Sequence, residues 1–328
     1  MVGAPMTFVF SSRILVCAAF LVAASWSCEG CTPTGDPDAA RTLAPNDVGF
    51  ADKDALALDP LCQGRRVAGA PCNGSEQFCD RRYDEVSYVT THNAMSNQDE
   101  GWLAPNHIHG LRQQWEDGVR AMMIDTHYDD EGGEEVPSLC HGSCRFGSID
   151  LSVALADMEA FLRCNPEQVL TLIVEAYVSP EDTEAAFEEA GLLSYVYTHS
   201  RGADWPTLGA MIESGQRLVV LSDDGGSPEW YMNLWEHAFE TPFAAERSGD
   251  LVCEKNRGDS SNSLFVLNHF LTAPLASQRL AEQVNTNPFL VDRATECREA
   301  FGRIPNFVTV DFYSVGDVFA ATADLNRL

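Results

Sequence analysis

The chain has 328 residues, and its 21 Lys and Arg residues against 49 Asp and Glu residues give a formal net charge of −28. A chain this acidic is repelled on average by nucleic acid and by anionic bilayers, so the composition argues against both as partners. Solubility outside the cell accounts for most of the carboxylates.

An export signal is predicted at the N-terminus. Arg13 precedes an apolar run over residues 14–24, which small residues and two cysteines, Cys28 and Cys31, follow. The run has the length of a signal-peptide core, whereas a transmembrane helix needs about 20 apolar residues. Residues 1–31 are therefore interpreted as a signal peptide or lipoprotein signal, and the alternative is a buried helix of the folded domain.

Cys28 and Cys31 raise the question of a lipid anchor. Each lies just after the apolar run, as the acylated cysteine of a bacterial lipoprotein does, but neither has a Leu three residues before it. Lipidation and ordinary secretion both remain open. No later segment reaches the length of a membrane span, so we expect membrane contact to be peripheral or through a lipid.

The remaining cysteines predict a disulfide framework. They are even in number, and an even count in an exported chain is typical of disulfide pairing. A zinc site is the competing use, but no CxxC pair remains among them and no His lies at finger spacing. Their separations make local bridges between Cys72 and Cys79 and between Cys140 and Cys144 the first expectation. The eight are Cys62, Cys72, Cys79, Cys140, Cys144, Cys164, Cys253 and Cys297.

Residues 32–59 are rich in Pro, Asp, Ala and Gly and lack apolar periodicity, which is typical of a flexible linker. The folded unit is then expected over residues 60–328, a size normal for one barrel domain. Short apolar runs alternate there with helical patterns, which indicates parallel βα units. Strands are predicted at 86–91, 120–126, 169–176, 217–222, 264–268 and 307–312, and helices at 151–162, behind Asp150 as a cap, and 181–190.

Polar residues interrupt these strands at their C-terminal ends. In a (β/α) barrel those ends converge on the active-site face. Period-two spacing also places several of them on one face of their strand, as with Asp125 and His127, so we expect one inward-facing set. The residues are His92, Asn93, Asp125, His127, Glu175, Asn268, His269 and Asp311.

Five segments resemble the phosphatidylinositol-specific phospholipase C X-domain superfamily, and they are most similar to its secreted, cysteine-bearing bacterial and fungal subgroup. They are 88–95 (YVTTHNAM), 118–125 (GVRAMMID), 139–142 (LCHG), 172–175 (LIVE) and 305–313 (PNFVTVDFY), in family order. The resemblance covers nearly all of the folded unit. It implies an α/β fold, a distorted (β/α)8 TIM-type barrel, and a phosphodiesterase that acts on a phospholipid or another small phosphodiester.

The resemblance also implies the catalytic roles. His92 would be the general base, His141 the general acid, and Asp311 the carboxylate that orients His92. Phosphodiester cleavage needs a group that removes a proton from the attacking hydroxyl and another that protonates the leaving alkoxide, and imidazoles do both near neutral pH. The alternative is that the three are polar residues with a structural role only.

A divalent cation, Ca²⁺ first and Mg²⁺ second, is expected beside the phosphoryl oxygens. Metal-free relatives carry an Arg at the position of Asp125, so Asn93, Asp125 and Glu175 would supply oxygen ligands instead. Metal-dependent relatives carry an acid two positions before Asp125, where this chain has Met123, which predicts weaker binding. A hydrogen-bond network without metal is the alternative.

The head group is left open. Asp223 and Asp224 end a predicted strand where inositol-binding relatives place basic or hydroxyl-binding residues. A glycerophosphodiester or a sphingomyelin-like lipid is therefore the alternative substrate, and the alternative to an enzyme is a non-catalytic binding protein on a barrel scaffold.

His127 and His269 are expected to support the site or the core rather than to catalyse. Structural roles are expected for His107, His109, His199 and His237, and core positions rather than lipid contact for Trp230, Tyr231 and Trp235.

Overall fold

The computed structural model of the protein describes residues 60–67, 69–130 and 132–327. The predicted signal, the linker over residues 32–59, and Cys28 and Cys31 lie outside the described residues. No described helix has the length and apolar character that a membrane span requires.

Eight parallel strands form a curled sheet in the order β6-β7-β5-β2-β1-β11-β10-β9. The two end strands, β6 and β9, do not pair with each other within the described residues, which leaves the barrel open between them. The strands are β1 (Tyr88–Thr91), β2 (Ala121–Asp129), β5 (Leu170–Ala176), β6 (Val196–Tyr197), β7 (Leu218–Ser222), β9 (Ala238–Glu240), β10 (Leu264–Asn268) and β11 (Phe307–Val310). The expected barrel-type α/β fold is confirmed.

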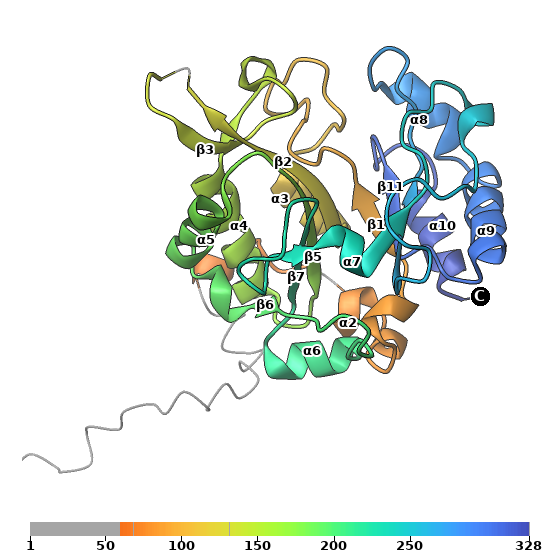
Figure 1. Cartoon of the computed structure of the whole chain (residues 1–328), viewed down its shortest axis with the longest axis horizontal. Helices are drawn as coiled ribbons and strands as arrows, with labels where there is room; N and C mark the ends of the chain where they lie inside the picture. Colours follow the sequence, from red (N-terminus) through yellow and green to blue (C-terminus); the bar gives the residue numbers. More distant parts are fainter. Residues whose placement is uncertain (1–59, 68, 131, 328) are drawn as a thin grey trace, which may run out of the picture. The chain divides into compact units, whose positions relative to one another are not determined.

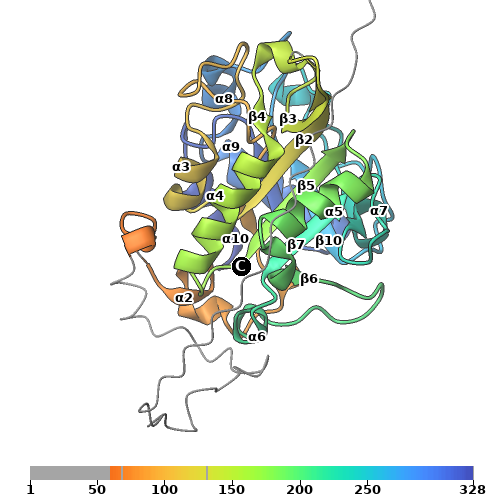
Figure 2. The same ribbon diagram turned by 90° about the vertical axis from the view of Figure 1, so that its left-hand side faces the viewer.

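Three short strands lie off this path. β3 (Val136–Leu139) pairs antiparallel with the long end of β2 and with β4 (Ile149–Asp150), and β8 (Met232–Asn233) pairs with β7. In Figures 1 and 2 the β2–β3 hairpin and α8 lie at one end of the barrel, and α2 and α6 lie at the other.

Helices surround the sheet. Figure 1 shows α4 and α5 on one side of the strands and α9 and α10 on the other, and Figure 2 shows α4 and α5 face on. The helices are α2 (Pro71–Gly74), α3 (Leu111–Asp117), α4 (Leu151–Cys164), α5 (Pro180–Glu189), α6 (Leu208–Ser214), α7 (Leu234–His237), α8 (Gln278–Val284), α9 (Phe289–Phe301) and α10 (Val318–Leu325). Asp150 precedes α4 as predicted, but its side chain makes no capping hydrogen bond.

Both faces of the strands are buried, which is why the apolar runs are nearly continuous. Alternate residues of β5 belong to different clusters. Leu172 and Val174 pack outward with Leu155 of α4, whereas Ile173 packs inward with Leu221 of β7. The same alternation turns the polar residues at the strand ends toward the inside of the barrel.

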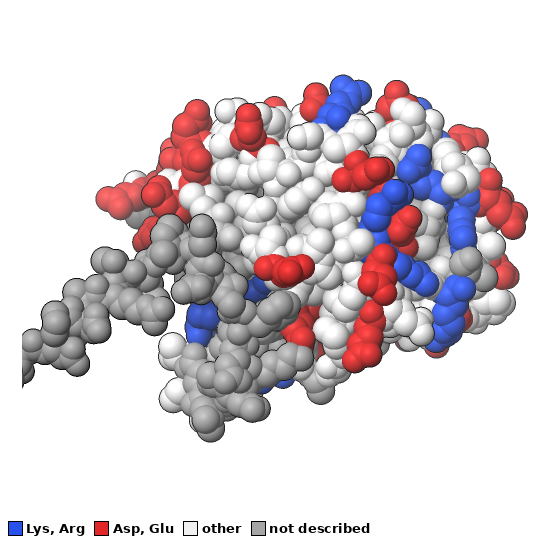
Figure 3. Space-filling view, turned by 90° about the horizontal axis from the view of Figure 1, so that it is seen from below, with Lys and Arg blue, Asp and Glu red and all other residues white. Residues whose placement is uncertain are grey.

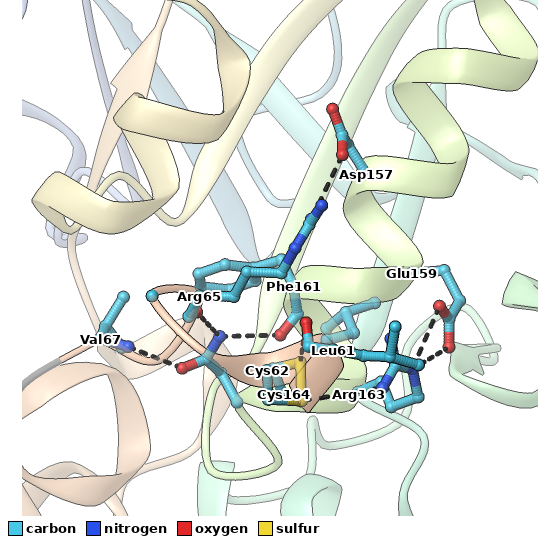
Figure 4. The surroundings of a disulfide bond; sticks show 12 residues. Leu61, Cys62, Arg65, Val67, Asp157, Glu159, Phe161, Arg163 and Cys164 are labelled. Carbon is cyan, nitrogen blue, oxygen red and sulfur yellow. Dashed lines mark hydrogen bonds and ion pairs between the residues drawn. A yellow bond between two sulfur atoms is a disulfide. The ribbon is translucent and has the colours of Figure 1, made fainter. Parts of the chain in front are cut away.

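All eight cysteines from Cys62 onward are paired, so the disulfide prediction is confirmed, including both local bridges. The bridges are Cys62–Cys164, Cys72–Cys79, Cys140–Cys144 and Cys253–Cys297. Figure 4 shows the first of them joining the start of the described chain to the end of α4, beside the ion pair of Arg65 with Asp157 at 3.3 Å. Loop closure over 102 residues makes this bridge the one that most restricts the unfolded chain.

Mass spectrometry of the non-reduced protein should find no free thiol among these eight cysteines. Replacing Cys62 and Cys164 together by Ala should lower the free energy of unfolding by about 2–5 kcal/mol, because the unfolded chain regains the freedom of a long loop. Two or more reactive thiols after oxidative expression would contradict the framework.

Basic side chains lie among acidic ones on one face of the protein (Figure 3). Figure 3 shows Lys and Arg side chains interleaved with Asp and Glu on one side of the face seen from below. Near the starts of β1 and β11, one cavity is lined by Arg81, Arg82, Asp84, Glu85, Arg298 and Arg303, among others. Arg82 is already paired with Asp84 at 3.2 Å.

Candidate active site

A cavity of about 350 Å³ opens at the carboxyl ends of the barrel strands. Its lining comes from β2, β5, β9, β10 and α7 and from the segments that follow β1, β5, β7, β9 and β10. The polar side chains in this lining are His92, Asn93, Asp125, Glu175, Tyr177, Asp223, Glu240, Arg257 and Asn268. Strand ends far apart in the sequence therefore meet at one place, as the sequence predicts for most of them.

His92 follows β1 and is held from three sides. Its Nδ1 atom lies 3.0 Å from Oδ1 of Asp311, which is 4% exposed, and its ring stacks on Phe270 with centroids 3.8 Å apart. His107 Nε2 lies 2.7 Å from the His92 carbonyl oxygen and donates to it. Burial lowers the pKa of His92, but the carboxylates of Asp311, Asp125 and Glu175 together outweigh it, so the pKa lies above its usual value.

Asp311 is itself positioned by two asparagines. Asn106 Nδ2 donates to Asp311 Oδ1 at 2.9 Å, and Asn285 Nδ2 donates to the Asp311 carbonyl at 2.8 Å. The second carboxylate oxygen is buried and has no partner in the described structure. The contact of Asp311 with His92 is therefore made through Oδ1, the oxygen that Asn106 also binds.

His141 lies beside the cavity rather than in its lining. It follows the end of β3, next to the Cys140–Cys144 bridge, and its Nε2 atom lies 3.2 Å from Nδ2 of Asn93. Asn93 has a left-handed backbone with φ of 51°, which an Asn tolerates, and this turn brings its amide to His141. Burial, followed by the charge of His92, lowers the pKa of His141.

Asp125 and Glu175 form a pair of carboxylates on neighbouring strands. They are partners in the register of β2 with β5, and Asp125 is 6% exposed. Burial and then the charge of Glu175 raise the pKa of Asp125 to about 7. Tyr177 donates from its hydroxyl to Glu175 Oε1 at 2.5 Å. Two carboxylates this close repel each other unless a proton or a cation lies near them.

The donor chemistry of this pair suits a hard cation, because carboxylate and amide oxygens are the ligands that Ca²⁺ takes. Asp125 and Glu175 do not belong to any set of three His, Cys, Asp or Glu ligand atoms that lie within 4.8 Å of one another in the described chain. The oxygens that would hold a cation there are the two carboxylates and the amide oxygen of Asn93, and the Asp223 carboxylate lines the same cavity. Met123 lines the same cavity and adds no oxygen.

His127 and His269 do not line the cavity. His269 is buried, contacts the Val284 carbonyl through Nε2 at 2.8 Å and accepts from Arg293, and His127 stacks on Tyr177 with centroids 4.4 Å apart. Of the expected core aromatics, Tyr231 is buried, whereas Trp235 lines the cavity.

Sequence reasoning missed several residues of this site: Asn106, Tyr177, Glu240, Arg257, Phe270 and Asn285. Glu240 ends β9, which was not predicted because it has only three residues. Arg257 follows β9 in a long connection with no strand pattern. Neither residue carries a signal in the sequence that would place it in the cavity.

Comparison with known proteins decides the family. The sequence model of the PI-PLC X 1 family matches residues 78–326, more than half of the chain. The chain belongs to the PI-PLC X family. Two relatives come from Arthroderma benhamiae. A PI-PLC X domain-containing protein 1 is 29% identical over 280 residues, which cover 78% of this chain and 90% of that protein. An uncharacterized secreted protein is 28% identical over 306 residues, which cover 84% of this chain and 68% of that protein.

Solved structures agree with this PI-PLC X fold. A phosphatidylinositol-specific phospholipase C of Staphylococcus aureus aligns with a TM-score of 0.53 over 76% of this chain and 95% of its own, at 15% sequence identity. Identity this low supports the fold alone. The resemblance read from the sequence is thereby confirmed at the level of family and fold.

Proposed function

We propose that this PI-PLC X protein is a phosphoric diester hydrolase or lyase of the phospholipase C type, in which His92 is the general base and His141 the general acid. The observation that carries the proposal is the buried Asp311 carboxylate, 3.0 Å from Nδ1 of His92 at the mouth of the cavity. This contact leaves Nε2 as the proton acceptor and stabilises the imidazolium once it forms.

The proposed reaction follows from this arrangement. His92 removes a proton from the hydroxyl that attacks phosphorus, a new P–O bond forms, and the bond to the lipid oxygen breaks as His141 protonates that oxygen. Where the head group carries a hydroxyl next to the phosphate, the product is a cyclic phosphate. Water opens that ring when the two histidines exchange roles.

Asn93, Asp125 and Glu175 would hold the proposed cation, Ca²⁺ or Mg²⁺, which would offset negative charge on the phosphoryl oxygens. The support for it is the unbalanced carboxylate pair, since burial and Glu175 raise the pKa of Asp125 to about 7. We include export in the proposal, because four disulfides are typical of proteins that fold in an oxidising compartment. A signal peptide or lipoprotein signal over residues 1–31 would deliver the chain there, and a lipid at Cys28 or Cys31 would anchor it.

Screening the purified protein against a panel of phosphodiesters, with phosphorus NMR as the readout, tests the proposal. Inositol, glycerol and choline diesters belong in the panel, because Asp223 lines the cavity where inositol-binding relatives place basic or hydroxyl-binding residues. A glycerophosphodiester or a sphingomyelin-like lipid is therefore the alternative substrate. A cyclic phosphate identifies an attacking hydroxyl on the head group, and a monoester alone identifies water. No turnover on any diester would favour a binding protein on a barrel scaffold.

A further inference from the structure

The cavity has a second wall, which the proposed acid–base chemistry does not use. It is made of Trp235, Glu240, Phe243, Arg257 and Asn268, from β9, β10 and the connections around them. Arg257 is the one Lys or Arg among the described residues that line the cavity. A single cation among several carboxylates needs an explanation.

The guanidinium of Arg257 is fixed on three sides. Its Nε atom donates to Glu240 Oε1 at 2.5 Å, and Glu240 is only 3% exposed. Its central carbon lies 4.4 Å from the ring centroid of Trp235 and 4.9 Å from that of Phe243. The two terminal nitrogens make no hydrogen bond within the described part of the chain. A rigid guanidinium with a free edge therefore borders the cavity.

Glu240 is held by amide groups as well as by Arg257. Asn256 Nδ2 donates to Oε1 at 2.9 Å, and Asn268 Nδ2 donates to Oε2 at 3.0 Å. Three donors to one buried carboxylate fix the geometry of its side chain. Glu240 thus acts as the anchor that sets the direction of the Arg257 side chain.

The backbone brings Arg257 to this anchor. Glu240 N donates to Arg257 O at 3.1 Å, and Asn256 N donates to Glu240 O at 2.8 Å. Gly258 follows with φ of +75°, and a Cβ there would lie 2.2 Å from the Ala238 carbonyl oxygen. Only glycine allows the segment to approach β9 this closely.

The same segment is tied to α9 on its N-terminal side. Cys253 is bonded to Cys297, and the guanidinium of Arg293 donates to the carbonyls of Leu251 and Val252 at 3.2 and 3.3 Å. Arg293 also donates to the Asn268 carbonyl at 3.0 Å. The disulfide and these hydrogen bonds therefore hold the segment that carries Arg257 beside the cavity.

The charge of Arg257 acts on Asp223 in the same cavity. Burial raises the pKa of Asp223, and the charge of Arg257 acts against that shift. The main charges that act on the pKa of His92 are instead Asp311, Asp125 and Glu175. Arg257 therefore lies near enough to Asp223, another polar residue of the lining, to act on its charge.

We propose that Arg257 selects the head group of the substrate: its free edge binds oxygen acceptors, and its position excludes a quaternary ammonium group. The planar guanidinium matches paired oxygen acceptors, whether hydroxyls or an anion. A quaternary ammonium group would need an aromatic face such as those of Trp235 and Phe243, and the guanidinium of Arg257 already lies over one face of each ring. The inference rests on the proposed function for its meaning but not for its test.

Equilibrium binding tests the role of Arg257 without requiring turnover, and so separates it from the proposed function. Titration calorimetry with phosphocholine and with a polyol phosphate, the tighter of glycerol 1-phosphate and myo-inositol 1-phosphate, compares ligands that share a phosphate and differ in the head group. The native protein should bind the polyol phosphate at least about tenfold more tightly. Arg257→Gln should weaken that ligand by about 10- to 100-fold, the scale of a lost charge-assisted hydrogen-bond pair, and reduce the preference to near unity.

Two further variants serve as controls for this binding experiment. Arg247→Gln removes a guanidinium from the same connection, paired only with Asp250 and 82% exposed, and should change neither affinity. The double variant Glu240→Gln/Arg257→Gln leaves no buried charge unpaired. If its unfolding temperature equals that of the native protein, a change in its ligand preference is due to the missing guanidinium and not to damage to the fold.

An unchanged preference in the folded double variant, or no binding of either ligand to the native protein, overturns the inference. A second outcome would overturn the proposed function instead. In that case the native protein prefers the polyol phosphate and Arg257→Gln loses this preference, but the native protein cleaves no diester. Where turnover is found, Arg257→Gln should raise KM for polyol diesters and leave kcat within about threefold, because head-group contacts persist from ground state to transition state.

Discussion

His92→Ala and His141→Ala should each lower kcat by about 10²–10⁴-fold or more on the diester that the native protein cleaves best. Each variant loses one of the two proton transfers at phosphorus. The steady-state rate with saturating substrate measures the effect. His109→Ala is the matched control, because His109 is bound to Asp99 at 2.9 Å and is not in the lining of the cavity. Undiminished turnover in either catalytic variant removes the mechanism.

The role of Asp311 has a separate readout. The Asp311 carboxylate raises the pKa of His92 against the effect of burial. Asp311→Asn should therefore lower the pH at which the His92 ring titrates, as NMR of the histidine ring protons would report, together with a loss of turnover. A loss of turnover with an unmoved titration would mean that Asp311 only supports the fold.

Removal of divalent cations should abolish turnover, and Ca²⁺ at about millimolar concentration, the weak end for oxygen-ligated sites, should restore it. Without a cation, the carboxylates of Asp125 and Glu175 repel each other and the anionic phosphodiester. The measurement is the rate after chelation and after stepwise addition of Ca²⁺ or Mg²⁺.

Asp125→Asn should raise the Ca²⁺ concentration that gives half-maximal turnover, because one of the two charged ligands is lost. Asp130→Asn, on the exposed turn after β2, is the control and should leave that concentration unchanged. Full activity of the native protein in excess chelator would return Asn93, Asp125 and Glu175 to a hydrogen-bond network without metal.

The sequence by itself determined six of the eight barrel strands, all but the short end strands β6 and β9, and the residues at their ends. Strands such as β5 and β10 are apolar on both faces because the barrel interior and the outer helices bury both, and this gives runs that can be read without a structure. Polar residues that end such runs, like Asp125 and Glu175, stand out for the same reason. Export chemistry and an even cysteine count likewise indicated full disulfide pairing.

Only the tertiary structure decided the second wall of the cavity and the supports of the first. Arg257 lies in a connection without periodicity, and it reaches the cavity through backbone pairing with Glu240 and a disulfide to α9. Phe270 and Asn106 touch His92 and Asp311 across long separations in the chain. Such contacts depend on how loops close over the barrel, and local sequence patterns do not encode that closure because no single segment contains both partners.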